Sequence, residues 1–107
     1  MVDKSELKTL AKNAVEEILN AYKEHKLVDY VSNALGIRFC QSLIGNEWVT
    51  DTIELQVTSG GPNVWVRVEE DKITGEVYWG SEKAEYEYYT RKARDILEIL
   101  EDILAHK

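Results

Sequence analysis

The residues best suited to catalysis or binding are carboxylates and aromatic rings that alternate with apolar residues over positions 52–88. Alternate residues of a strand face the same side of a sheet. One face would therefore carry these side chains: Trp65, Tyr78, Glu76, Glu85, Glu87, Glu54 and Arg67. Neighbouring carboxylates can act as general acid and base only where burial separates their pKa values, and an open sheet face lacks that burial. Rigid rings beside carboxylates are instead typical of a protein-binding surface.

A second group of carboxylates lies in residues 90–107, where apolar residues recur at helical spacing after a capping Thr90. Bases crowd the start of this segment, while the acids Glu98, Glu101 and Asp102 occupy its later turns. This order opposes the helix macrodipole and costs about 0.3 kcal/mol per charge. Two ion pairs would partly offset the cost: Arg91 with Asp95, and Arg94 with Glu98. The three acids are candidate partner-binding residues, and a merely solvated helix face is the alternative.

Three other features have simpler structural interpretations than a chemical one. Cys40 has no histidine in a recognisable relation to it, so we expect a small buried hydrophobic residue. His25 lacks a second ligand at metal spacing and is interpreted as the cation at a helix end. The segment 58–63, TSGGPN, has the glycines of a tight connection but no lysine and no following helix. We therefore expect no catalytic residue, no metal and no cofactor.

The alternation in residues 52–80 predicts an antiparallel sheet, and its register follows from keeping the apolar side chains on one face. The predicted partners are Val57 with Val64, Leu55 with Val66, Ile53 with Val68, Glu54 with Arg67 as an ion pair, and Gln56 with Trp65. In the next two strands the predicted inward residues are Ile73, Gly75, Val77, Trp79, Ala84, Tyr86 and Tyr88.

Helical spacing predicts an amphipathic helix near the N-terminus, capped by Asp3 or Ser5, and a short second helix over 27–35 that Gly36 would cap. Residues 37–44 are ambiguous and are interpreted as a first strand. Together these elements predict a single α+β domain spanning residues 1–107. It has a four- or five-stranded antiparallel sheet, with N-terminal and C-terminal amphipathic helices packed on one face.

The net charge of −7 is unevenly distributed along the chain. Residues 1–46 carry six acids and six bases, whereas residues 47–107 carry fourteen acids and seven bases. An acidic surface repels phosphate, so we expect no direct binding to nucleic acid and a basic protein surface as the partner. Solubility alone is the other explanation. No run of residues is long and apolar enough for a membrane, and the single cysteine fits a cytoplasmic protein.

Two short motifs, GGPNVWV at 60–66 and YWG at 78–80, give the sequence a resemblance to a known group. It resembles small uncharacterised proteins encoded by phages and other mobile elements, which share a GGPN-type hairpin and a following YWG strand. The resemblance covers roughly residues 27–80. It implies a small α+β protein and a mobile-element setting, but no activity and no functional residue.

The sequence favours a non-catalytic protein-binding module. A sharper hypothesis is an anti-CRISPR-like inhibitor of a host nucleic-acid-binding defence protein, in which carboxylates imitate phosphate and Trp65 and Tyr78 serve as anchors. One alternative is a structural protein that self-associates as a weak homodimer through its sheet face. Another is a small enzyme with an acid and base carboxylate pair.

Overall fold

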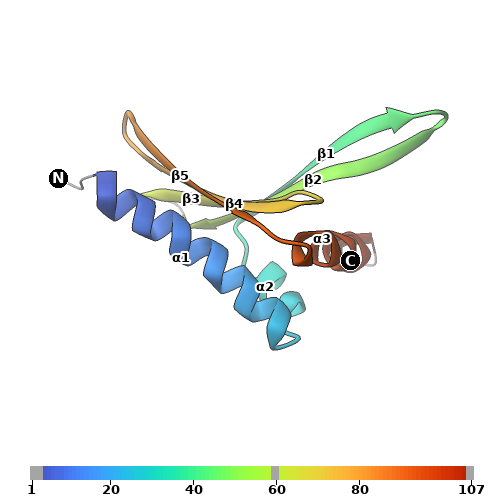
Figure 1. Ribbon diagram of the computed structural model, residues 1–107, viewed down its shortest axis with the longest axis horizontal. Coiled ribbons are helices and arrows are strands. Elements are labelled where there is room, and N and C mark those ends of the chain that lie inside the picture. Colours follow the sequence, from blue (N-terminus) through green and yellow to red (C-terminus); the bar gives the residue numbers. More distant parts are fainter. Residues whose placement is uncertain (1–3, 59–60, 106–107) are drawn as a thin grey trace.

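The computed structural model describes residues 4–58 and 61–105, which form three helices and five strands. In chain order these are α1 (Lys4–Lys23), α2 (Leu27–Ser32), β1 (Gly36–Ile44), β2 (Glu47–Thr58), β3 (Asn63–Val68), β4 (Lys72–Trp79), β5 (Glu82–Tyr89) and α3 (Lys92–Ala105). The fold is α+β, as expected, with the helices on one side of the sheet (Figure 1).

The five strands lie in chain order and each runs antiparallel to its neighbour, so the sheet is a meander with β1 and β5 at its edges. The strand β1 confirms the first strand that was ambiguous in the sequence. Figure 1 shows the two edge hairpins, β1–β2 and β4–β5, rising away from the helices. The sheet face opposite the helices, called the outer face from here on, is therefore curved inward.

The pairing of β2 with β3 confirms most of the predicted register. The confirmed partners are Leu55 with Val66, Ile53 with Val68, Glu54 with Arg67 and Gln56 with Trp65. The predicted pairing of Val57 with Val64 is wrong, because Val64 lies opposite Thr58 and Val57 is an extra residue in β2. This β-bulge is hidden in the apolar pattern, since Val57 still packs partly buried against the core.

The second helix ends earlier than its sequence pattern predicts. It stops at Ser32, and Gly36 is not its cap but the first residue of β1. Asn33 holds the C-cap position. The backbone N–H of Leu35 already donates to the carbonyl oxygen of Gln56 at 2.8 Å, so the chain joins the sheet directly after the helix. Pairing with β2 therefore overrides the local preference of glycine for a helix end.

The expected helix caps have different outcomes. Thr90 caps α3 as predicted, because its hydroxyl oxygen accepts a hydrogen bond from the backbone N–H of Lys92 at 3.2 Å. Ser5 lies inside α1 instead of capping it, and Asp3 lies outside the described residues. Within the described residues, no helix has the length and apolar character needed to cross a lipid bilayer.

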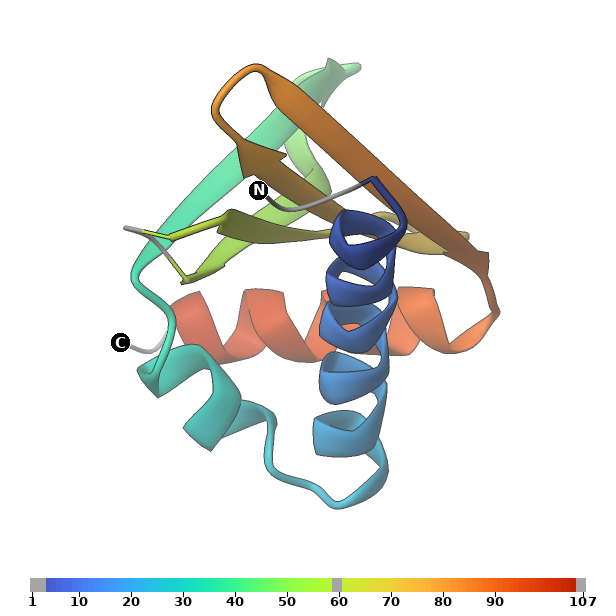
Figure 2. The same ribbon diagram turned by 90° about the vertical axis from the view of Figure 1, so that its left-hand side faces the viewer.

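The helices cover the inner face of the sheet in different directions, as Figure 2 shows. Helix α1 contacts β3, β4 and β5, whereas α3 contacts β2, β3 and β4. Their apolar faces and the inward side chains of the strands form one core. Its fully buried larger members are Leu7, Val15, Ile18, Ile53, Leu55, Val66, Val68, Ile73, Val77, Ile96 and Leu100.

Helix α1 touches the sheet most closely where Gly75 of β4 lies against the backbone of Ala11. A Cβ atom at position 75 would overlap the carbonyl oxygen of Ala11, so glycine is required here for space. Ala11 itself is fully buried. Two small residues thus let the backbone of α1 rest on the backbone of β4.

The predicted inward residues of β4 and β5 differ in burial. Ile73 and Val77 are fully buried, whereas Trp79 is 37% exposed and Tyr88, which lies opposite Ile73 and shares its face, is 41% exposed. Trp79 is the last residue of β4, at the tip of a hairpin that rises away from α1 (Figure 1). Tyr88 belongs to an edge strand, which has a neighbouring strand on one side only.

We expect the substitution Gly75→Ala to lower the free energy of unfolding by about 3 kcal/mol, because the added methyl group must push α1 away from β4. Urea denaturation of the purified variant measures this loss. Gly61→Ala is the matched control, since a Cβ at position 61 meets nothing within 4 Å. Equal stability of the two variants would show that α1 can shift on the sheet without loss.

Candidate functional site

The structure places the predicted binding residues on two different sides of the sheet. Five of them lie in strands and belong to the outer face: Trp65, Glu76, Tyr78, Glu85 and Glu87. The other three lie on α3, which covers the inner face: Glu98, Glu101 and Asp102. A single flat partner surface therefore cannot contact all eight residues at once.

Glu76 departs most from its prediction as an open surface carboxylate, because only 3% of its surface is exposed. Its carboxylate forms an ion pair with Arg67 and accepts a hydrogen bond from the Tyr78 hydroxyl at 2.6 Å. The Lys83 ammonium lies 3.7 Å away on the neighbouring strand. Side chains from three strands thus cover and neutralise this carboxylate, which its own strand pattern could not predict.

The predicted ion pair between Glu54 and Arg67 is replaced by this arrangement. The two residues are cross-strand neighbours, as predicted. The Arg67 guanidinium, however, pairs with Glu76 and lies 3.8 Å from Glu69. Beside it, the hydroxyl of Thr74 is buried and has no hydrogen-bond partner among the described residues.

The remaining outer-face candidates are also engaged within the molecule. The Trp65 ring is half-buried and lies under the Arg38 guanidinium, 4.2 Å from the ring centre. Glu85 pairs with Lys83 at 2.7 Å. Glu87 pairs with Lys72, and the hydrogen bond from Lys72 lowers the pKa of the Glu87 carboxyl.

We expect Glu76→Gln to lower the free energy of unfolding by about 2 kcal/mol, because it weakens the charged hydrogen bonds to Arg67 and Tyr78 inside a covered site. Glu85→Gln is the matched control and should cost less than about 1 kcal/mol, since that side chain is 42% exposed. Urea denaturation midpoints measure both values. Losses of equal size would mean that burial adds nothing to the Glu76 contacts.

Three of the six tyrosines should ionise late. A hydrogen bond to Glu76 raises the pKa of Tyr78, one to Asp95 raises that of Tyr22, and burial raises that of Tyr30. A pKa that is higher in the folded state gives stability that is complete below pH ~10 and is lost as the pH rises through the folded pKa. Tyr78→Phe should therefore remove phenolate absorbance that appears only above pH ~10 in the wild type. Loss of absorbance at or below pH ~10 in this variant would contradict the raised pKa of Tyr78.

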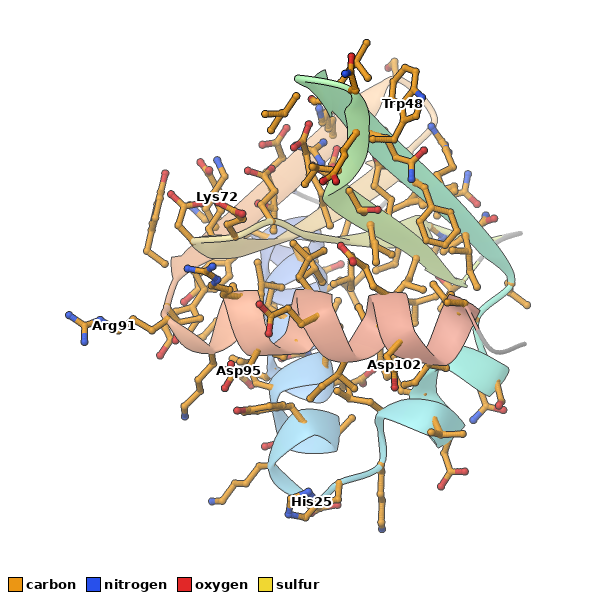
Figure 3. All side chains as sticks on the ribbon, turned by 90° about the vertical axis from the view of Figure 1, so that its right-hand side faces the viewer. His25, Trp48, Lys72, Arg91, Asp95 and Asp102 are labelled. Carbon is orange, nitrogen blue, oxygen red and sulfur yellow. The ribbon has the colours of Figure 1, made fainter. Side chains whose placement is uncertain are left out.

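On α3, the acids differ in where they point. Glu98 pairs with Arg94 at 3.6 Å, as predicted. Asp95 accepts a hydrogen bond from the Tyr22 hydroxyl at 2.9 Å, in place of the predicted pairing with Arg91, which Figure 3 shows extending outward. Glu101 is half-buried and lines a hollow with Phe39 and Gln41 of β1, whereas Asp102 is exposed and lies on the side of α3 away from the sheet (Figure 3).

The most exposed apolar surface is the far part of the β1–β2 hairpin, residues 39–52, which we call the arm. It extends beyond the helices, and Trp48 lies at its far end (Figures 1 and 3). Its large exposed apolar side chains are Phe39 at 48%, Leu43 at 57%, Ile44 at 61% and Trp48 at 66%. Cys40, predicted to be buried, is exposed on the same arm.

A hollow of about 340 Å³ lies where the arm meets the C-terminal end of α3. Its lining residues are Phe39, Gln41, Thr50, Glu101, Leu104 and Ala105. The arm carries two acids, Glu47 and Asp51, and no base, and Glu101 is the charged residue of α3 that lines the hollow. The last carbonyl groups of a helix add further negative potential at this place. The arm and this hollow therefore combine apolar and acidic character.

Sequence reasoning missed the arm residues because their alternation is that of an ordinary half-buried strand. Phe39 lies opposite the fully buried Ile53, and Leu43 lies opposite Trp48 farther along the same hairpin. Whether a helix covers such a strand depends on where that helix ends in space. The sequence offered one usable signal, which is the lack of any charged residue from Phe39 to Asn46.

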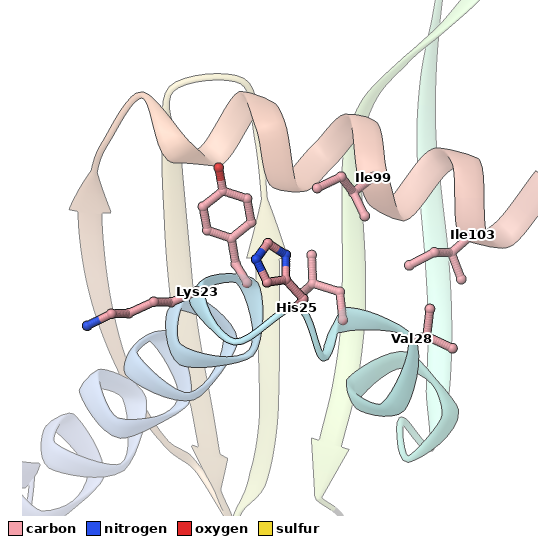
Figure 4. Close-up of a pocket in the computed structure, with 7 residues that line it drawn as sticks. Lys23, His25, Val28, Ile99 and Ile103 are labelled. Carbon is pink, nitrogen blue, oxygen red and sulfur yellow. The ribbon is translucent and has the colours of Figure 1, made fainter.

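Other hollows of the surface differ from this one in the residues that line them. A groove of about 490 Å³ between the end of α1, α2 and α3 is lined mainly by apolar side chains, with His25 at its mouth (Figure 4). A smaller hollow beside Pro62 contains one carboxylate, Glu6, and no second titratable group. Among the described residues, neither of these two hollows is lined by a pair of carboxylates. A third hollow, of about 550 Å³, is lined by the adjacent carboxylates Glu70 and Asp71 together with Arg91 and Arg94. Within residues 4–58 and 61–105, no three His, Cys, Asp or Glu side chains are grouped as metal ligands.

Comparison of the chain with protein-family models, curated proteins and solved structures found no match. The resemblance to phage and mobile-element proteins therefore stays a prediction, and only this chain's own residues bear on its function.

Proposed function

We propose that this chain is a non-catalytic protein-binding module whose contact surface is the arm together with the hollow beside α3. The observation that carries the proposal is the exposure of Phe39, Leu43, Ile44 and Trp48 on one projecting hairpin. Large apolar side chains grouped at a surface are typical of interaction sites. Tryptophan in particular dominates the binding energy of many interfaces.

The charge of this region supports a basic partner. Glu47 lies beside Trp48 and Glu101 borders the hollow. The arm contains no base, and the two bases of α3, Lys92 and Arg94, lie in its first turn, away from the hollow. Acidic groups at the rim of an apolar contact steer a basic partner and select against acidic ones. The affinity should therefore fall as the salt concentration rises.

The outer face supports partner binding less well than the arm. Its carboxylates Glu76, Glu85 and Glu87 each pair with a base of the same face. Imitation of phosphate needs carboxylates that a partner's bases can reach without competition. A nucleic-acid-binding protein stays one class of basic partner, with the arm in place of the outer face as the contact surface.

Self-association is the second candidate, because the same exposed arm could bury its apolar side chains against another copy. Sedimentation over a range of concentrations separates the two candidates. A dimer that forms through the arm would favour an assembly role, and a monomer that binds other proteins would favour the binding module.

The test compares proteins captured from a lysate by the wild type with those captured by Trp48→Ser and Trp79→Ser. Trp79 is the matched control, because it is an exposed tryptophan at the tip of the other edge hairpin. We expect Trp48→Ser to weaken binding of the captured protein by about 2 kcal/mol, or roughly thirtyfold, and Trp79→Ser to leave it unchanged.

A second pair of variants tests the charge. Glu101→Gln should weaken the same complex several-fold at low salt, whereas Asp102→Asn should have little effect because Asp102 lies on the other side of α3. If Trp48→Ser captures the same proteins as the wild type with equal affinity, the arm is not the binding surface.

A further inference from the structure

We propose that the partner binds as an added strand, with an extended basic segment pairing along the free edge of β1. This rests on the proposed function and adds to it the geometry and the residue pattern of the bound segment. Within residues 4–58 and 61–105 the strand β1 pairs with β2 alone, so the backbone N–H and C=O groups on its other side have no strand partner there. Its last seven residues, 38–44, are all exposed.

The two edges of the sheet differ in their protection against strand addition. Four of the eight residues of β5 are charged, and charges on an edge strand discourage pairing. Only one of the nine residues of β1 is charged, and none is proline. That residue, Arg38, stacks over Trp65 on the outer face. The free edge of β1 therefore lacks the charges and proline that usually prevent strand addition.

The irregularity in this hairpin does not block the edge either. The register shifts where Cys40 pairs with Thr52 and Gln41 pairs with Thr50, so the extra residue is Asp51 of β2. A bulge protects an edge when the edge strand itself is deformed. Here β1 keeps an unbroken series of partners from Gly36 to Ile44, and its free side can accept a regular strand.

The residues beside this edge define the chemistry of the added strand. On the inner face, Phe39 and Gln41 of β1 border the hollow that also contains Glu101 and the end of α3. Side chains of an added strand that point to this face would meet apolar surface first and negative potential beyond it. Lysine or arginine at alternate positions of the added strand fits this surface. Its aliphatic stem can pack on Phe39, and its charged end can reach the Glu101 carboxylate.

A second copy of the chain fits this edge poorly. Two β1 strands paired antiparallel would place both α3 ends on the same side of the joined sheet, each with its Glu101. Like charges facing each other across an interface select against the pairing. The one base of β1, Arg38, is already stacked over Trp65 on the outer face and offers no compensation there.

The test uses a synthetic peptide about as long as β1, with lysine and valine at alternate positions. One control peptide has glutamate in place of lysine, and another carries N-methyl groups on alternate amides, which removes the donors along one edge. We expect the lysine peptide to bind and to slow hydrogen exchange in residues 38–44. Methylation should weaken binding at least about tenfold, because several backbone hydrogen bonds are lost.

Two protein variants place the peptide on the correct edge. Leu43→Lys puts a repelling charge in β1 and should abolish binding, whereas Tyr89→Lys does the same in β5 and should not. Both side chains are exposed, at 57% and 65%, so neither change disturbs the core.

Each other outcome has a definite meaning. If the methylated peptide binds as tightly as the unmethylated one, strand addition is overturned while protein binding through the arm stands. Strand addition of a basic segment is also overturned if the lysine peptide does not bind, or if the glutamate peptide binds equally well. In these cases the capture experiment with Trp48→Ser still decides the proposed function independently.

Discussion

The contact between Gly75 and the backbone of Ala11 is the constraint on which the rest of the structure depends. A strand that lacks one side chain at its centre allows α1 to lie closer to the sheet than any other residue would permit. This fixes α1 against β3, β4 and β5. The helix α3 therefore packs beside it on the same face, against β2, β3 and β4. The C-terminal end of α3 approaches the arm at Phe39, Gln41 and Thr50, but within the described residues neither helix covers the far end of the arm at Trp48. The exposure of the arm thus follows from where the closest packing occurs on the other half of the sheet.

On the opposite face, polar contacts replace a second layer of helices. Glu76 is buried by Arg67, Tyr78 and Lys83, which bring charges of both signs into one network. A buried carboxylate without such partners would be costly, whereas this network holds three strands in one register. The bases of the outer face are used there, whereas the arm carries two acids, Glu47 and Asp51, and no base. The protein therefore has one face on which acids and bases pair with each other, and an arm whose charged residues are all acids.

The sequence predicted the features that depend on residues close together in the chain. Period-two alternation revealed the strands and most of the β2–β3 register, and period 3.6 revealed the long helices. Three features depend on segments far apart and were not predictable in this way. The bulge at Val57 follows from how two strands close around a loop, and the burial of Glu76 follows from side chains on neighbouring strands. The exposure of Trp48 follows from where the helices end, since none of the described helices covers it.

The free edge of β1 also bears on the tendency of the chain to aggregate. The strand β1 has nine residues with a single charge and no proline. Extended segments of other chains can pair with such an edge, which is the first step of aggregation. A net charge of −7 opposes that step, because copies repel one another before their edges meet. The net negative charge of the chain thus counteracts the aggregation that the free edge of β1 would otherwise permit. An edge strand with so few charges is tolerable only on a molecule whose net charge keeps its own copies apart.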